Sequence, residues 1–144
     1  MMDLTPSHPS FERVAALFDD YRMHYGFASD PVATRAWLTE QLDASRLSLY
    51  ADEEGTGLIT TTVLPASLTL RTFWQIRDLY VAPSVRRAGT ARRLLRHVVD
   101  QARAAGAIRV SLQTETDNAA ALALYTSLGF TPVTGLMSLS LGAG

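Results

Sequence analysis

The chain has 144 residues, of which 47% are hydrophobic and 19% charged, a composition typical of one folded domain and not of a disordered chain. It contains no cysteine, which excludes disulfides, thiolate catalysis and thiolate zinc sites, and its three histidines are too scattered to predict a metal site. The formal net charge of −1 and the isoelectric point near 6.3 do not favour a nucleic-acid partner.

The first third of the chain predicts a short strand followed by two helices. We expect only a short, poor strand within the first ten residues. Ser10 is a suitable N-cap for a helix over residues 11–25, whose apolar positions follow a 3.6-residue spacing and which Gly26 ends. Asp30 precedes a proline and predicts the N-cap of a second helix over residues 31–44.

The middle of the chain predicts three strands in succession. Residues 47–51 alternate between apolar and polar, and residues 58–64 are rich in β-branched side chains. An acidic turn at residues 52–55 separates these two runs, and the Pro-Ala-Ser sequence at residues 65–67 is expected to end the second. Residues 70–81 predict a third, longer strand.

The last third predicts two helices and three more strands. Apolar residues at helical spacing predict a helix that Gly89 or Thr90 opens and Gly106 closes, and a strand at residues 108–114 follows. Asp117 or Asn118 is expected to cap a short helix that runs to Leu128. Two final strands are expected near residues 130–133 and 136–141. The predicted order of elements is (β)ααβββαβαββ.

Residues 76–91 carry the strongest functional signal. A β-prone run stops at Pro83, continues through Arg86 and Arg87, and meets Gly89 where a helix begins. The N-terminus of a helix binds anions because its first N–H groups have no acceptor and the helix dipole is positive there. The segment lacks the Lys-Ser/Thr pair of a P-loop and the three glycines of a dinucleotide fingerprint. It therefore predicts a phosphate site of another kind, the alternative being an ordinary capped helix.

Three motifs together identify a resemblance to a known family. Arg86-x-x-Gly89-x-Ala91 resembles the pyrophosphate loop of the GNAT superfamily of N-acetyltransferases. The preceding Asp78-Leu79-Tyr80-Val81-x-Pro83 and the later Asn118-x-x-Ala121-x-x-Leu124-Tyr125-x-x-x-Gly129-Phe130 strengthen that resemblance. It covers residues 70–133 closely and the rest of the chain by element order.

The resemblance implies an α+β fold with a mixed, mostly antiparallel sheet that is splayed between its fourth and fifth strands, in a single domain of residues 1–144. The implied cofactor is acetyl-CoA, which enters the gap between the segments that end at Val81 and at Thr114. The residues implied to bind it are Leu79, Tyr80, Val81, Arg86, Arg87, Ala88, Gly89, Thr90, Ala91, Asn118 and Tyr125.

Two catalytic residues are predicted. The resemblance makes Tyr125 the acid that returns a proton to the thiol leaving group; the alternative is a core residue, since its spacing on an amphipathic helix also fits that role. Asp78 is expected to take up the amine's proton through water, to hold the acceptor ammonium, or simply to pair with Arg77 or a backbone amide. The resemblance also implies the main-chain N–H of Val81 or a neighbour as the donor to the oxyanion.

The resemblance implies an acceptor site at the first two helices and their connection. The pattern there resembles a subgroup of small bacterial acetyltransferases described as histone- or polyamine-acetyltransferase-like. Tyr21, Arg22 and Tyr25, with Asp78, are the predicted substrate-binding residues, because aromatic faces and nearby acids favour a cationic amine. The alternative is that these aromatic side chains pack the helix onto the sheet.

These observations predict an enzyme that moves the acetyl group of acetyl-CoA directly to a primary amine, namely a small cationic one. The alternatives are a non-catalytic acyl-CoA-binding sensor or scaffold, and an enzyme that acts on a protein amine or with another acyl donor. We expect a small-molecule amine partner, no nucleic acid, no membrane and no metal. No apolar run reaches the length of a membrane span, which predicts a cytoplasmic location. The resemblance also makes a homodimer an expectation.

Overall fold

The structure is a computed structural model that describes all residues, 1–144, and divides into two compact units, residues 1–113 and 114–144. The expectation of a single domain stays a prediction. No helix is both long and apolar enough to cross a membrane. The second unit holds one helix, α4 (Ala119–Ser127). The first unit holds β1 (Met2–Leu4), α1 (Phe11–His24), α2 (Pro31–Asp43), β2 (Ser48–Ala51), β3 (Gly57–Ala66), η1 (Ser67–Thr69), β4 (Arg71–Val81), η2 (Pro83–Val85), α3 (Thr90–Ala104) and β5 (Val110–Ser111).

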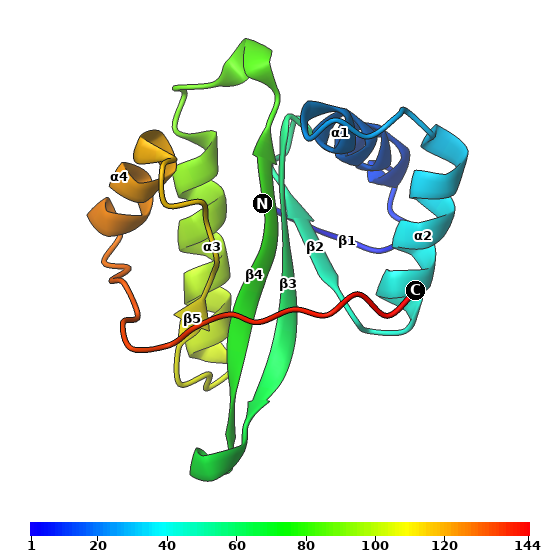
Figure 1. Cartoon of the computed structure of the whole chain (residues 1–144). Helices are drawn as coiled ribbons and strands as arrows, with labels where there is room; N and C mark the ends of the chain where they lie inside the picture. The colour runs from blue at the N-terminus through cyan, green and yellow to red at the C-terminus, as the bar shows by residue number, and fades with distance from the viewer. The chain divides into compact units, whose positions relative to one another are not determined.

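The first unit is built on a mixed sheet. Its strands lie in the order β1-β2-β3-β4-β5; the first four are antiparallel to one another, and β5 is parallel to β4. A parallel pair needs a crossover connection, which α3 supplies. Figure 1 shows α3 on one face of the sheet and both α1 and α2 on the other. This is the α+β architecture that the sequence predicts.

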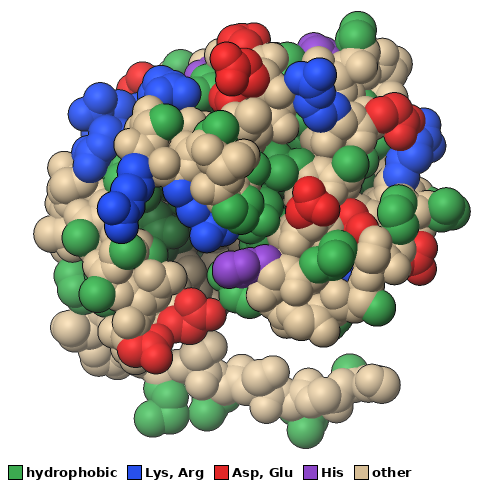
Figure 2. Space-filling view, turned by 90° about the horizontal axis from the view of Figure 1, so that it is seen from above, with side chains coloured by type: hydrophobic (Ala, Val, Ile, Leu, Met, Phe, Trp, Pro, Cys, Tyr) green, Lys and Arg blue, Asp and Glu red, His purple; other side chains and the backbone are tan.

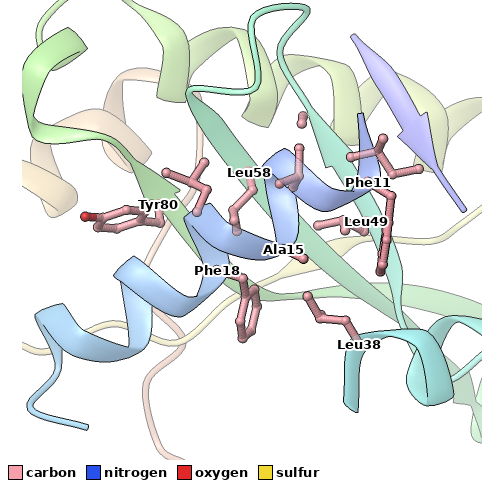
Figure 3. Packing of buried hydrophobic residues seen from close by; sticks show 11 residues of the cluster. Phe11, Ala15, Phe18, Leu38, Leu49, Leu58 and Tyr80 are labelled. Carbon is pink, nitrogen blue, oxygen red and sulfur yellow. The ribbon is translucent and has the colours of Figure 1, made fainter. Parts of the chain in front are cut away.

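The core between α1, α2 and the sheet follows the predicted apolar face of α1. Phe11, Ala15 and Phe18 are buried on this face and pack toward strand residues of the sheet (Figure 3). Tyr25 departs from the prediction, because α1 ends at His24 and the Tyr25 side chain is 55% exposed. The remaining buried members of this cluster are Leu4, Val14, Leu17, Leu38, Leu49, Ala51, Leu58 and Tyr80.

The β3–β4 hairpin is longer than predicted. The sequence predicts that Pro65 ends its first strand, but β3 continues to Ala66, and Pro65 pairs with Thr72. A proline is tolerated here because it lies at the end of the ladder, where its missing N–H costs little. The chain then reverses through η1, and Leu70 adopts a left-handed conformation with φ of 55°.

The sheet is splayed between β4 and β5, as predicted. The strand expected over residues 108–114 is reduced to the two residues of β5, which pair with Trp74 and Gln75 of β4. From Ile76 to Val81, β4 has no partner strand on that side. This edge of β4, from residue 76 to residue 81, therefore has backbone groups that no neighbouring strand uses.

The second unit confirms the predicted helix and contradicts the two predicted strands. The side chain of Asn118 caps α4 by accepting a hydrogen bond from the N–H of Ala121 at 3.2 Å. No strand forms at residues 130–133 or 136–141, so the final ββ of the predicted order is wrong. A β-prone run becomes a strand only where another strand pairs with it, and this run has no such partner. Its apolar side chains are accordingly exposed: Val133, Leu136, Met137, Leu139 and Leu141.

Candidate active site

The loop between β4 and α3 ends in a helix start without a side-chain cap. Arg87 and Gly89 both have positive φ, of 68° and 81°, so the chain turns sharply before Thr90 begins α3. Gly89 is the N-cap residue and contributes no capping hydrogen bond from a side chain. Since the first N–H groups of any α-helix lack intrahelical acceptors, this helix start offers donors and positive potential to an anion.

Arginine side chains surround this helix start. Arg86 and Arg87 are exposed on the loop. The Nε of Arg86 donates to the carbonyl oxygen of Val81 at 3.1 Å, and its guanidinium carbon lies 5.7 Å from the centroid of the Tyr80 ring. Figure 2 shows basic side chains gathered on the left of this face, the side on which α3 lies in Figure 1. The positive charge of the arginine side chains thus lies beside the uncapped N–H groups at the start of α3.

A glycine that the sequence reasoning overlooked lets α3 approach the sheet. A Cβ on Gly57 would lie 2.7 Å from Cγ2 of Thr90 and 3.0 Å from Cδ1 of Leu94, so only glycine fits against the first turns of α3. The N–H of Gly57 is fixed by a hydrogen bond to Oδ1 of Asp52 at 2.7 Å. The signal in the sequence was a glycine at the start of a strand, which often marks close backbone approach.

The N–H of Val81 lies on the open edge of β4. The N–H of Ala82 points to the β3 side and donates to the carbonyl oxygen of Thr56 at 2.8 Å. Because N–H groups alternate in direction along a strand, Val81, one residue earlier, directs its N–H to the side that β5 does not reach. Leu79 has the same direction as Val81, whereas Tyr80 pairs with Leu58 and is buried in the core.

A β-bulge places Asp78 on the face covered by α1. Thr60 pairs with Asp78 but Thr61 pairs with Ile76, so Arg77 is the extra residue on β4. The half-buried carboxylate of Asp78 accepts a hydrogen bond from the Tyr21 hydroxyl at 2.9 Å on Oδ1 and another from the Thr60 hydroxyl on Oδ2. Its partners are therefore hydroxyl groups from α1 and β3.

Aromatic rings gather beside this carboxylate. The ring centroid of Tyr21 lies 5.4 Å from that of Tyr25 and 5.5 Å from that of Tyr80. The imidazole of His24 lies 6.0 Å from the Tyr80 ring and 5.2 Å from the Tyr25 ring. The last turns of α1 and the end of β4 thus form one group of rings next to Asp78. The sequence reasoning named its tyrosines but missed His24.

Arg22 belongs to a different network, which fixes the α1–α2 connection. Its Nη1 donates to Oδ1 of Asp19 at 3.1 Å, and its guanidinium lies over the Phe27 ring. Asp19 is 3% exposed and also accepts hydrogen bonds from the Ser29 hydroxyl at 2.6 Å and from Thr34. The Ser29 hydroxyl, followed by the backbone N–H of residue 30, lowers the pKa of Asp19 from its ordinary value of 3.8 to about 2. A substrate-binding role for Arg22 stays a prediction.

The other predicted residues lie in the second unit. Tyr125 is half-buried on α4, and its ring centroid lies 6.0 Å from that of Phe130 in an edge-to-face arrangement. Asn118 uses its Oδ1 to cap the same helix. The roles of Tyr125 as acid and of Asn118 as cofactor ligand stay predictions.

Comparison with known proteins identifies the family. The model of the Acetyltransferase (GNAT) family matches residues 11–130. The uncharacterized N-acetyltransferase YhfO of Bacillus subtilis (strain 168) is 34% identical over 127 residues, which cover 86% of this chain and 85% of that protein. The [ribosomal protein bS18]-alanine N-acetyltransferase of Salmonella typhimurium is 35% identical over 88 residues, or 61% of this chain and 55% of that protein.

A solved structure extends the likeness to the whole chain. The crystal structure of a probable acetyltransferase superposes with a TM-score of 0.87 at 30% identity, covering 100% of this chain and 99% of that one. The histone- or polyamine-acetyltransferase-like subgroup stays a prediction. The chain belongs to the GNAT acetyltransferase family and is an acyl-CoA-dependent N-acetyltransferase.

Proposed function

We propose that this enzyme transfers the acetyl group of acetyl-CoA directly to the primary amine of a small cationic molecule. The observation that carries the proposal is the placement of Asp78: a carboxylate held beside aromatic rings, on the strand whose open edge ends at Val81. A carboxylate among aromatic faces attracts an ammonium group, since both contribute negative potential.

The donor half of the proposal rests on the loop before α3. The helix start fits a pyrophosphate because Gly89 presents no side chain, the first N–H groups are uncapped by side chains, and Arg86 and Arg87 are exposed beside them. When bound, acetyl-CoA supplies an activated acetyl thioester. We assign the N–H of Val81 as the donor to the acetyl carbonyl oxygen, where negative charge develops.

The acceptor half rests on Asp78. Asp78 binds the ammonium and accepts its proton, directly or through water, which leaves a neutral amine able to attack. Tyr125 supplies the proton that the leaving sulfur needs as the C–S bond breaks, and the proton that the attacking nitrogen then loses restores the Tyr125 hydroxyl. Asn118 assists in holding the cofactor. The rings of Tyr21 and Tyr25 line the approach of the amine.

A protein amine is the second candidate acceptor. The Salmonella relative is named for acetylating an alanine of a ribosomal protein, and 61% of this chain aligns with it. An α-amino group is also a cation near neutral pH, so Asp78 would bind it by the same chemistry. The two candidates differ in size: a small molecule must fit as a whole beside Asp78, whereas a protein acceptor needs room for the chain that follows its amine.

An amine panel measured by thiol release tests the proposal. We expect turnover of acetyl-CoA with spermidine or an aminoglycoside, and less with a lysine peptide or a peptide that begins with alanine. Turnover with the alanine peptide alone would favour the second candidate, and no turnover with any amine would contradict both.

Two further measurements complete this test. Titration calorimetry with acetyl-, propionyl- and succinyl-CoA identifies the acyl donor, for which we expect acetyl-CoA to bind best. Tyr125→Phe should lower kcat while leaving the Kd of acetyl-CoA unchanged. Unchanged product formation in that variant would remove Tyr125 from the mechanism.

A further inference from the structure

We propose that Thr60 and Tyr21 are positioning residues that hold the carboxylate of Asp78 in a single orientation for the acceptor amine. The inference rests on the proposed function of Asp78 and adds two residues to it. Thr60 was not recognised in the sequence, and Tyr21 was expected only to line the acceptor site.

The hydroxyls of Tyr21 and Thr60 donate hydrogen bonds to different oxygens of the Asp78 carboxylate. Tyr21 donates to Oδ1 from α1, and Thr60 donates to Oδ2 from β3. The two donors are 57 and 18 residues away from Asp78 in sequence, so the arrangement exists only in the folded chain. A carboxylate bonded on both oxygens cannot rotate without losing a hydrogen bond, and hydrogen bonds to a charged group are stronger than those between neutral groups.

The β-bulge is what brings Thr60 and Asp78 together. In a regular ladder without the bulge, Thr60 would pair with Arg77, and Asp78 would pair with Ile59 on the face opposite the one that α1 covers, because side chains alternate along a strand. Thr60 is fully buried, so its hydroxyl cannot reach a substrate itself. Its role at the site must therefore pass through Asp78.

Tyr21 connects the carboxylate to the aromatic group. Its hydroxyl bonds Asp78 while its ring packs edge-on or tilted against Tyr25, Tyr80 and Phe18 at 5.3 to 5.5 Å. One side chain thereby fixes the orientation of the carboxylate and the place of the neighbouring rings. We expect the acceptor, rather than acyl-CoA, to depend on it.

The rotamer of Asp78 gives a test that needs no substrate. Three-bond couplings between Hα and the two Hβ protons of Asp78 should indicate one χ1 rotamer in the wild-type chain. In the double variant Tyr21→Phe/Thr60→Val these couplings should average over several rotamers. A single rotamer retained in the double variant would overturn the proposal. An absence of turnover with every amine would instead contradict the proposed function, without affecting this measurement.

Kinetics then separate positioning from a structural role. With spermidine as the acceptor, Thr60→Val should lower kcat/KM roughly tenfold, the loss of one hydrogen bond to a charged group, while the KM of acetyl-CoA stays unchanged. Thr60→Ser keeps the hydroxyl and should restore most of the activity. In an Asp78→Asn background, Thr60→Val should cause no further loss; an additional tenfold loss there would show that Thr60 does not act through Asp78.

Thr62→Val is the matched control. Thr62 lies on the same strand and the same face, but its hydroxyl donates to the carbonyl oxygen of Arg46 instead of the site. This variant should leave kcat/KM for the amine unchanged. If it lowers kcat/KM as much as Thr60→Val does, the loss reflects general disturbance of β3 and the positioning role is wrong.

Discussion

The loop before α3 and the surroundings of Asp78 lie at the same end of β4, but they are built in opposite ways. The loop presents backbone N–H groups without side-chain caps, and all of its residues come from one continuous stretch, 82–91. The carboxylate of Asp78 is already bonded by side chains from α1 and β3. One region offers unused donors to a ligand, and the other holds a single group in place.

This difference indicates which partner each region serves. A pyrophosphate is the same in every acyl-CoA, so a short backbone motif suffices to bind it and recurs in recognisable form. An acceptor amine differs from one enzyme to another, and its site depends on side chains that long-range packing brings together. Variants in the two regions should therefore alter binding of different substrates.

The largest effect is expected from Asp78→Asn. Removal of a charged partner from an ammonium site typically costs 2–5 kcal/mol, so kcat/KM for the amine should fall by roughly a hundredfold. The Kd of acetyl-CoA, measured by calorimetry, should stay within about twofold. Asp100→Asn, at an exposed position on α3, is the control and should behave like wild type. A comparable loss of acetyl-CoA affinity in Asp78→Asn would contradict the view that the two regions bind different substrates.

Gly89→Val should affect the other substrate. Gly89 has φ of 81°, which a β-branched residue adopts only with strain of about 1–2 kcal/mol or more, so the helix start should shift and the Kd of acetyl-CoA should rise roughly tenfold. Gly106, at the far end of α3, has φ of 78° and open space around it. Gly106→Val therefore imposes the same backbone strain away from the loop. If both variants weaken acetyl-CoA binding equally, loss of stability and not loss of the anion site is the cause.

Arg87→Ala should weaken acetyl-CoA binding several-fold, and the loss should shrink as salt is added, because the exposed guanidinium acts on the phosphates through a screened charge. Calorimetry at two ionic strengths measures both effects. Arg103→Ala removes another exposed arginine, at the opposite end of α3, and should change neither value. A salt-independent loss in Arg87→Ala would indicate that the arginine shapes the loop instead of attracting the anion.

The smallest effect on turnover is expected from Asp19→Asn, which acts on stability. The pKa of Asp19 is lowered to about 2 in the folded chain, below the value of about 3.9 usual for an unfolded chain. The ionised carboxylate therefore stabilises the fold above about pH 4, and this contribution is lost as the pH falls toward 2. The Tm of wild type should exceed that of Asp19→Asn at neutral pH, and the gap should close in this acidic range. A Tm difference that does not change with pH would contradict the stabilising role of the ionised Asp19 carboxylate.

The elements that the sequence predicted well are those with local signals. Asn118 caps α4 and Asp30 caps α2 through their side chains, and Gly89 opens α3, because caps act within one turn of the chain. The two final strands failed for the converse reason. A strand needs a partner that the local sequence does not contain, and residues 130–141 find none.

By itself, the sequence determined the order of helices and strands up to α4 and the anion-binding loop, since both depend on residues a few positions apart. It also named Asp78, Tyr21 and Tyr25 without saying what joins them. Only the tertiary structure decided that a β-bulge brings Thr60 to Asp78, that Gly57 admits the start of α3, and that Thr34 of α2 joins Asp19 and Arg22 in one network. These contacts join residues from separate elements, and the burial and hydrogen bonding that select them exist only once the chain has folded.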